Sequence, residues 1–223
     1  MATTITITTT IAITIAEDRI GLSLTPPGSM FPPRMDTAHQ TEAGEKDDSR
    51  SIPKSSHPAV PKRFDRLARL VGGGGMEKLT SSHVAVIGLG GVGSFVAEGL
   101  ARSGVGRLTL VDFDDVCVTN FNRQLHAVEG SIGKAKASLM EARVRAINPR
   151  CDVRAILQFY EKPTSEQILT PAPDAVVDCI DNLTAKLHLL SSCVERGIPV
   201  VSSLGASARL DPTRVSVAPL TET

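Results

Sequence analysis

Short apolar runs alternate with amphipathic stretches along most of the chain. Strands are predicted for five apolar runs, at residues 84–87, 107–112, 151–157, 173–181 and 198–203. Helices, in which apolar positions recur every three or four residues, are predicted at residues 94–104, 133–149, 165–170 and 183–197. Such alternation is typical of right-handed crossovers between parallel strands. The predicted fold class is therefore α/β, with a doubly wound, mostly parallel sheet of the Rossmann-like, nucleotide-binding type.

The folded region is predicted to begin at Lys62. KRFDRLARLVGGGG places Phe64, Leu67 and Leu70 at helical spacing, before a run of glycines that should end the helix. The stretch MEKLTSS then forms a short turn that leads into the first strand. A single domain is expected over residues 62–223.

Residues 1–61 differ in composition from the rest of the chain. The opening MATTITITTTIAITIA is a low-complexity tract without the basic segment of a secretory signal or the arginines of a mitochondrial presequence. The stretch that follows is rich in Pro, Ser and acidic residues and has no sustained hydrophobic period. Because it buries too little apolar surface to offset the entropy of ordering, a disordered N-terminal tail is expected. A wrongly assigned start codon is an alternative explanation.

The composition of the 223 residues agrees with this fold. Hydrophobic residues make up 41% and aromatic residues only 3%, with no Trp, so Val, Ile, Leu and Ala must form most of the core. These residue types suit a parallel sheet that is buried on both faces. The 24 basic and 24 acidic residues cancel, which argues against a protein that coats a polyanion.

The four cysteines indicate neither zinc binding nor dithiol chemistry. Cys117, Cys151, Cys179 and Cys193 lie far apart and form no CxxC pair, so four reduced thiols and no zinc site are predicted. The sequence also has no apolar run of about 18 residues that could cross a bilayer. A soluble, cytoplasmic protein is therefore expected.

The sequence VIGLGGVG follows the first predicted strand directly. Its glycines allow the backbone to turn sharply and approach a phosphate at the positive N-terminus of the next helix; they are Gly88, Gly90, Gly91 and Gly93. Asp112 ends the second strand, where a carboxylate can accept ribose hydroxyls. A nucleotide site is therefore predicted where the strands end.

Two ligand classes fit this glycine turn, a dinucleotide such as NAD and a nucleoside triphosphate. Backbone N–H groups serve the phosphates of a dinucleotide, whereas a triphosphate usually requires side-chain cations and a metal. Arg123 and Lys136 can supply the cations, and Lys134 is expected to be solvent-exposed. Asp181 can hold Mg²⁺ through oxygen, although it could instead be the N-cap of the helix that follows. The sequence therefore favours ATP over NAD.

The loop VDFDDVCVTNFNRQLH, residues 111–126, supplies the other candidate ligands. Asp114 is expected to orient either the ribose or the cations of the loop. Asn120, Arg123 and Gln124 are expected to bind the phosphates.

Four motifs in this region together resemble one protein family. They are GLGGVGS, LVDFDDVCVTNFNRQLHA, the GKAK helix that ends in INP, and VDCIDN. In combination they are similar to the ThiF/MoeB superfamily of adenylate-forming enzymes, which is related to the ubiquitin-activating enzymes. The similarity runs from Arg63 to about Ala218, and CVTNFNRQLHA is closest to the branch of tRNA threonylcarbamoyladenosine dehydratases.

The resemblance implies ATP-dependent activation of a carboxylate, in which attack on the α-phosphorus releases pyrophosphate and forms an acyl-adenylate. In the dehydratase branch, the threonyl carboxylate of threonylcarbamoyladenosine in tRNA is activated and then captured by the carbamoyl group of the same nucleoside. The positions that match the family's ATP and Mg²⁺ ligands are Gly91, Asp112, Asn120, Arg123, Gln124, Lys136 and Asp181. Arg123 and Lys136 are the catalytic candidates, because fixed cations stabilise the charge that develops on the phosphates. Asn182, which follows Asp181 in VDCIDN, is a further cofactor-binding candidate.

Other activities are compatible with the same motifs. Dehydratases carry a further C-terminal region with a cysteine and an apolar segment, and relatives that activate sulfur-carrier proteins carry paired CxxC motifs. The sequence stops at Thr223, before either feature. Activation of a ubiquitin-like or sulfur-carrier protein, and non-catalytic nucleotide binding by a fragment, are therefore alternatives.

The resemblance also implies partners and a location. They are tRNA carrying threonylcarbamoyladenosine and a second copy of the chain, in a homodimer. Arg63 or Arg66 of RFDR resembles the arginine that some relatives donate across the dimer, unless it is only a surface charge. In a eukaryote, association with the mitochondrial outer membrane through the missing C-terminal region is the alternative to the cytoplasm.

Overall fold

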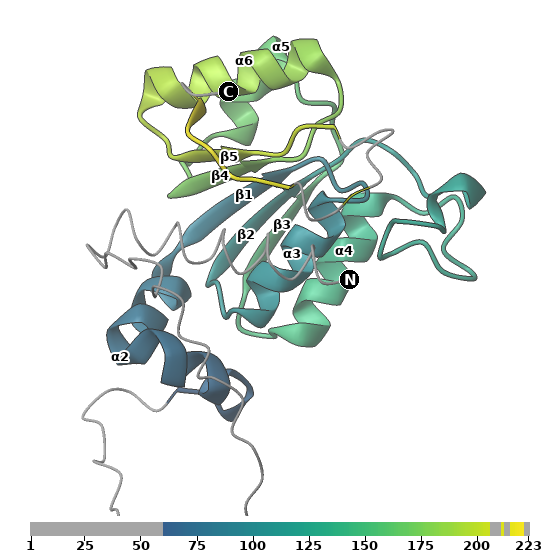
Figure 1. The fold of residues 1–223 in the computed structure, drawn as a ribbon. Coiled ribbons are helices and arrows are strands. Elements are labelled where there is room, and N and C mark those ends of the chain that lie inside the picture. The colour runs from purple at the N-terminus through teal and green to yellow at the C-terminus, as the bar shows by residue number, and fades with distance from the viewer. Residues whose placement is uncertain (1–59, 206–210, 212–214, 221–223) are drawn as a thin grey trace, which may run out of the picture.

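The computed structural model describes residues 60–205, 211 and 215–220 of the chain. A five-stranded parallel sheet forms its centre, in the order β3-β2-β1-β4-β5 (Figure 1). The strands are β1 (His83–Ile87), β2 (Arg107–Val111), β3 (Asp152–Ile156), β4 (Ala175–Asp178) and β5 (Val200–Ser202). This order confirms the doubly wound, parallel sheet. Because the chain moves outward from β1 in both directions, a crevice is expected where β1 and β4 end.

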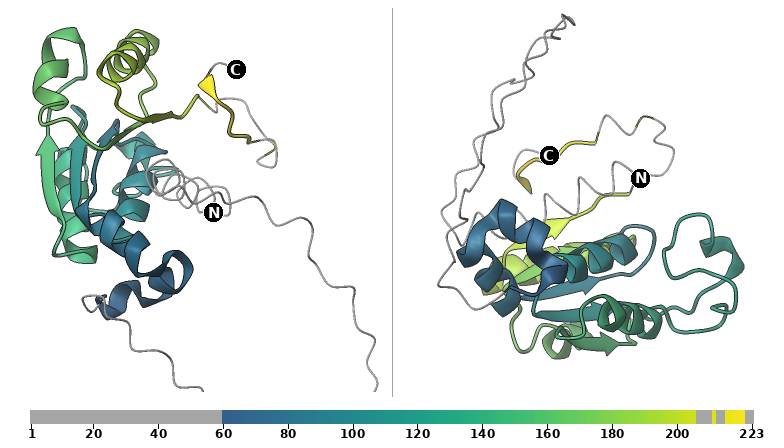
Figure 2. Two further views of the ribbon diagram at one scale, coloured as in Figure 1. Left: turned by 90° about the vertical axis from the view of Figure 1, so that its left-hand side faces the viewer. Right: turned by 90° about the horizontal axis from the view of Figure 1, so that it is seen from below.

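Helices cover both faces of the sheet (Figure 2). The helices α3 (Gly93–Arg102) and α4 (Lys136–Ile147) lie on one face, and α5 (Lys162–Ile168) and α6 (Leu183–Arg196) lie on the other (Figure 1). Each connects two parallel strands, as a right-handed crossover requires. Gly197 ends α6 in the left-handed conformation, with φ of 64°, as its place after the last apolar residues predicts.

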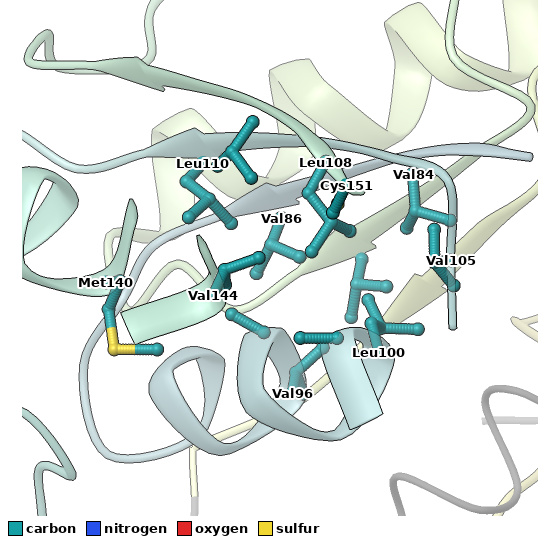
Figure 3. Close-up of a cluster of buried hydrophobic side chains, with 14 of the residues drawn as sticks. Val84, Val86, Val96, Leu100, Val105, Leu108, Leu110, Met140, Val144 and Cys151 are labelled. Atoms are coloured by element: carbon teal, nitrogen blue, oxygen red, sulfur yellow. The ribbon is translucent and has the colours of Figure 1, made fainter. Parts of the chain in front are cut away.

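Alternate residues of each strand enter two separate cores. Val84 and Val86 of β1 pack with Leu100 and Met140 beneath α3 and α4 (Figure 3). Ala85 and Ile87 face the other core, beneath α5 and α6. This two-sided burial explains why the strands consist of nearly continuous apolar residues.

The first helix differs from its prediction. The glycine run was expected to end it, but α2 (Asp65–Ser81) continues beyond the glycines through MEKLTS. Only Gly72 leaves the helical conformation, with φ of 72°, and it produces a kink. The helix resumes because Met76 and Leu79 of its second half are buried in the core. A short 3-10 turn, η1 (Lys62–Phe64), precedes it.

The expected tail at residues 1–61 lies outside the described residues, except for Val60 and Pro61. Both are half-buried, and Val60 packs against the core beneath α3 and α4. The packed region therefore begins slightly before the predicted boundary at Lys62. Among the described residues, no helix is both long enough and apolar enough to span a bilayer.

Candidate nucleotide-binding site

The glycine turn between β1 and α3 has no room for side chains at two of its positions. A Cβ atom added at Gly93 would lie 1.8 Å from the carbonyl oxygen of Gly88. One added at Gly88, where φ is 89°, would lie 2.8 Å from the carbonyl oxygen of Cys179. The backbone thus passes close to β4 and enters α3 directly. Bare backbone at the start of a helix is what a phosphate requires.

Asp112 joins the end of β2 to this turn. Its carboxylate accepts hydrogen bonds from the backbone N–H of Leu89, at 2.6 Å, and of Asp114, at 2.9 Å. Burial raises the pKa of Asp112, and the two backbone hydrogen bonds oppose that rise. An ionised carboxylate offers about four acceptor positions, so further positions remain for the hydroxyls of a ribose.

Lys136 and Asp114 form an ion pair at the edge of the site. Lys136 is the first residue of α4, and its Nζ lies 2.7 Å from Oδ2 of Asp114. The lysine side chain is only 6% exposed, whereas that of the aspartate is 46% exposed. Asp114 therefore orients a cation, which is one of the two roles expected for it. Lys134 is exposed to solvent, as predicted.

The loop between β2 and α4 folds back over the glycine turn. Its short 3-10 helix, η2 (Val118–Asn120), is held by the buried Asn120, whose Oδ1 accepts from the N–H of Cys117 at 3.0 Å. The side chain of Arg123 lies against Gly91. A Cβ atom added at Gly91 would be 3.3 Å from Cγ of the arginine. The guanidinium donates to the carbonyl oxygen of Thr119 at 2.9 Å. A cation is thus held beside the glycine turn.

Gln124 lies beside the same turn and is bonded to a residue that sequence reasoning missed. Its Oε1 lies 3.2 Å from Nε2 of His126, and its Nε2 is 3.9 Å from a Cβ added at Gly90. Burial, together with the charge of Lys136, lowers the pKa of His126 to about 4, so the imidazole is neutral near pH 7. A histidine that donates to Oε1 leaves the amide N–H groups of Gln124 to face the turn. The histidine two residues after the glutamine in RQLH is the signal that could have indicated this role.

Asp181 and Asn182 lie between β4 and α6 and have different roles. Oδ1 of Asn182 accepts from the N–H of Ala185 at 3.0 Å, so Asn182 is the N-cap of α6 and the alternative cap role for Asp181 is wrong. Asp181 is exposed and forms no hydrogen bond or ion pair with any other described residue. Its carboxylate is therefore available to a ligand.

The side chains at the edge of the sheet where Asp181 lies fit Mg²⁺ better than a metal held by protein ligands alone. Within the described ranges, no group of three or more His, Cys, Asp or Glu side chains could hold a metal ion. Mg²⁺ commonly binds one or two carboxylates together with the phosphates of a nucleotide and several waters. A single free carboxylate, that of Asp181, matches this mode. All four cysteines have free thiols.

A second buried ion pair, at the ends of β4 and β5, was not predicted. Lys186 of α6 donates to Oδ2 of Asp178, to Oγ of Ser202 at 3.2 Å and to the carbonyl oxygen of Ser203 at 3.0 Å. Asp178 is fully buried, and its other oxygen accepts from the N–H of Ile180 at 3.0 Å. The pair fixes the segment that carries Asp181. Lys186 falls on the apolar face of the helix predicted at residues 183–197, and this position is the signal in the sequence that could have indicated the ion pair.

The two arginines proposed to act across a dimer lie at the opposite edge of the sheet. Arg63 donates to the carbonyl oxygen of Ile147, at the end of α4, over 2.7 Å. This bond gives Arg63 a structural role within its own chain. Arg66 is exposed. Because β1 and β3 begin at this edge, neither arginine lies at the nucleotide edge of its own chain.

Comparison with known proteins identifies the family that this chain resembles. The model of the ThiF family matches residues 64–219. The tRNA threonylcarbamoyladenosine dehydratase of Bacillus subtilis is 49% identical over 161 residues, which cover 72% of this chain and 63% of that protein. The protein of the same name from Haemophilus influenzae is 45% identical over 161 residues, which cover 72% of this chain and 62% of that protein. The chain thus spans about three fifths of the length of these curated relatives.

A solved structure extends the similarity to three dimensions. The crystal structure of the E. coli tRNA N6-threonylcarbamoyladenosine dehydratase, TcdA, in complex with ATP matches with a TM-score of 0.70 and 42% sequence identity. The match covers 72% of this chain and 66% of that one.

Proposed function

The chain belongs to the ThiF family, and we propose that it is the nucleotide-binding part of an ATP-dependent tRNA threonylcarbamoyladenosine dehydratase. The observation that carries this proposal is the arrangement around the glycine turn. Asp112, Arg123 and Gln124 lie at the glycine turn, and Lys136 at the start of α4 pairs with Asp114 of the preceding loop. The names of the most similar relatives support the same activity.

ATP fits this arrangement better than NAD. The backbone of the turn is sufficient for a pyrophosphate, so a dinucleotide offers no further phosphate to Arg123 and Lys136. A triphosphate carries more charge and binds best where cations are already in place. The ATP complex of the E. coli relative supports this choice.

The proposed reaction has two steps. First, a carboxylate oxygen of the threonyl group attacks the α-phosphorus of ATP, and the bond to the leaving pyrophosphate breaks. Arg123 and Lys136 stabilise the negative charge that develops on the transferring and leaving groups. Second, the carbamoyl group of the same nucleoside attacks the activated acyl carbon. The ring closes, and AMP leaves with the former carboxylate oxygen.

Asp181 would hold Mg²⁺, which supplies charge neutralisation to the phosphates when bound. The buried pair of Lys186 and Asp178 keeps the backbone before Asp181 in place, since Asp178 accepts from the N–H of Ile180. The contribution of the chain is therefore a fixed carboxylate at the open edge of the sheet.

The proposed partners are tRNA carrying threonylcarbamoyladenosine and a second copy of the chain. A homodimer is the commonest symmetric assembly, and it allows an arginine from the opposite edge of one subunit to reach the nucleotide of the other. Arg66 is the better candidate, because Arg63 is already bonded to Ile147. Light scattering at micromolar concentration should give the mass of a dimer, and a monomer would contradict this part of the proposal.

Exchange of labelled pyrophosphate into ATP tests the proposed activity, because it requires only the adenylation step. Exchange should depend on tRNA that carries threonylcarbamoyladenosine, and the same tRNA without the modification is the control. Exchange stimulated by a small protein ending in Gly-Gly, and not by the tRNA, would assign the chain to carrier-protein activation instead.

A further inference from the structure

The outer face of α6 is apolar and yet open to solvent. The helix lies over β4 and β5 (Figure 1), and its inner face belongs to the core beneath α5 and α6. On the outer face, Leu183 is 67% exposed, Leu187 is 57% exposed and Val194 is 69% exposed. Leu190, which lies between the last two, is half-buried. A contiguous apolar stripe on a helix that already covers a core is typical of a surface that binds another molecule.

The spacing of these four residues, which we call the α6 seam, makes the stripe complementary to itself. They follow one another at intervals of four, three and four residues, the spacing of a coiled-coil seam. This spacing is the same when it is read from either end, with its midpoint between Leu187 and Leu190. A two-fold axis through the midpoint therefore places the seam on the seam of a second copy, in antiparallel orientation. Leu183 then lies opposite Val194, and Leu187 lies opposite Leu190.

The charges of α6 also permit this antiparallel pairing. Thr184 and Ser191, the exposed residues beside the seam, are uncharged. The exposed charges of the helix, Glu195 and Arg196, lie beyond the last residue of the seam, and Arg196 already has an acidic partner. In the antiparallel pair, Glu195 comes level with the uncharged Asn182 of the second copy. No two like charges of the helices meet, and the two helix dipoles point in opposite directions, which is favourable.

We propose that the α6 seam is the interface of a homodimer in which the two copies of α6 pack antiparallel. The inference rests on the proposed function, which includes a homodimer, and it assigns a surface to that assembly. α6 begins beside Asp181 at the nucleotide edge and ends with Arg196 at the opposite edge. Antiparallel pairing therefore brings the opposite edge of one copy level with the nucleotide edge of the other. An arginine donated across the dimer requires this relation.

Light scattering over a series of protein concentrations tests the interface. The wild-type chain should be dimeric at micromolar concentration. Leu187→Glu places a charge inside the apolar seam, so it should raise the dissociation constant of the dimer roughly 100-fold and give a monomer. Val128→Glu is the matched control, because Val128 is 56% exposed, as Leu187 nearly is, but lies in the loop between β2 and α4. This control variant should remain dimeric.

A pair of substitutions tests the direction of the helices. Leu183→Glu and Val194→Lys each place a charge against an apolar side chain of the second copy, so each alone should weaken the dimer. Combined in one chain, they place unlike charges opposite each other in the antiparallel pair. The combined variant should therefore dimerise about tenfold more tightly than either single variant. A parallel pair would bring like charges together, so a combined variant weaker than both single variants would overturn the antiparallel arrangement.

The remaining outcomes separate this inference from the proposed function. If Leu187→Glu stays dimeric, the seam is not the interface, although the homodimer itself stands. A wild-type chain that is monomeric at all concentrations would overturn both the seam and the homodimer. Calorimetric titration of the same preparations with ATP should give equal affinities for the wild type and Leu187→Glu, because the seam lies outside the nucleotide site. If Leu187→Glu loses its circular dichroism signal, Leu187 is packed within the single chain, and the inference is wrong.

Discussion

Two lysines of this protein are buried beside an aspartate at the same edge of the sheet, yet their surroundings differ. Lys186 donates to Asp178, Ser202 and Ser203, which uses all three N–H groups of its ammonium. Lys136 donates to Asp114 and to no other residue in the described part of the chain, and its partner is 46% exposed. The first lysine is saturated by the protein. The second still has donors for a ligand.

This difference separates a structural ion pair from a binding one. A charge buried with all its hydrogen bonds satisfied gains nothing from a ligand, and it is strongly unfavourable if its partner is removed. When a charge with free donors next to an open edge is removed, the protein loses little stability, but it binds an anion less tightly. Residue type and burial alone would not distinguish the two, because both lysines are about 5% exposed.

The largest effect is expected from breaking the saturated pair. Lys186→Met should lower the free energy of unfolding by about 3–5 kcal/mol, because it leaves the carboxylate of Asp178 buried without a cation. Urea unfolding followed by circular dichroism measures this loss. Adding Asp178→Asn to the same chain should recover more than half of it, since Asn retains an oxygen for the N–H of Ile180 and removes the charge. No recovery would show that the charge is not the cause.

The next effect concerns His126, the neutral neighbour of the open pair. Its pKa is lowered to about 4 in the folded chain, from an ordinary value of 6.5. The unfolded chain therefore binds more protons between these values, so stability should rise with pH from about 4 to about 6.5, by at most about 3 kcal/mol. Urea unfolding at several pH values measures the slope. His126→Asn should flatten it, and an unchanged slope would exclude His126 as its source.

A smaller effect is expected from breaking the open pair. Lys136→Met should weaken the binding of ATP by a factor of about 10 to 30, because it removes about 1.5–2 kcal/mol of charge-assisted hydrogen bonding. The free energy of unfolding should change by less than about 1 kcal/mol, since the partner Asp114 is half-exposed. Calorimetric titration and urea unfolding of one preparation compare the two quantities. A stability loss as large as that of Lys186→Met would remove the distinction between the pairs.

The sequence predicts the centre of the sheet well because β1, β2 and β4 are buried on both faces. Val84 to Ile87 of β1 are all buried, so the apolar run and the strand coincide. The run at 173–181 is longer than β4, which ends at Asp178. The chain bends there because the carboxylate of Asp178 accepts from the N–H of Ile180, and hydrophobicity does not report such a bond.

The site is predictable only where it depends on local motifs. The glycine turn and Asp112 follow directly from strand ends and spacing. Lys186 does not, because its role comes from contacts with segments that are distant in sequence, such as Ser202. The roles of Asn182 and Asp181 depend on which of two adjacent side chains caps α6, and only the structure distinguishes them.

The central claim is that the loop after β2 holds the phosphates of ATP while a carboxylate is adenylated. Pyrophosphate exchange by Arg123→Ala, in the presence of tRNA carrying threonylcarbamoyladenosine, tests it most directly. We predict a rate roughly 100-fold below that of the wild type, equivalent to about 3 kcal/mol of transition-state stabilisation. Lys134→Ala, which removes an exposed cation near the same loop, should remain within about threefold of the wild type. If both variants exchange at the wild-type rate, the loop does not bind the phosphates and the claim is wrong.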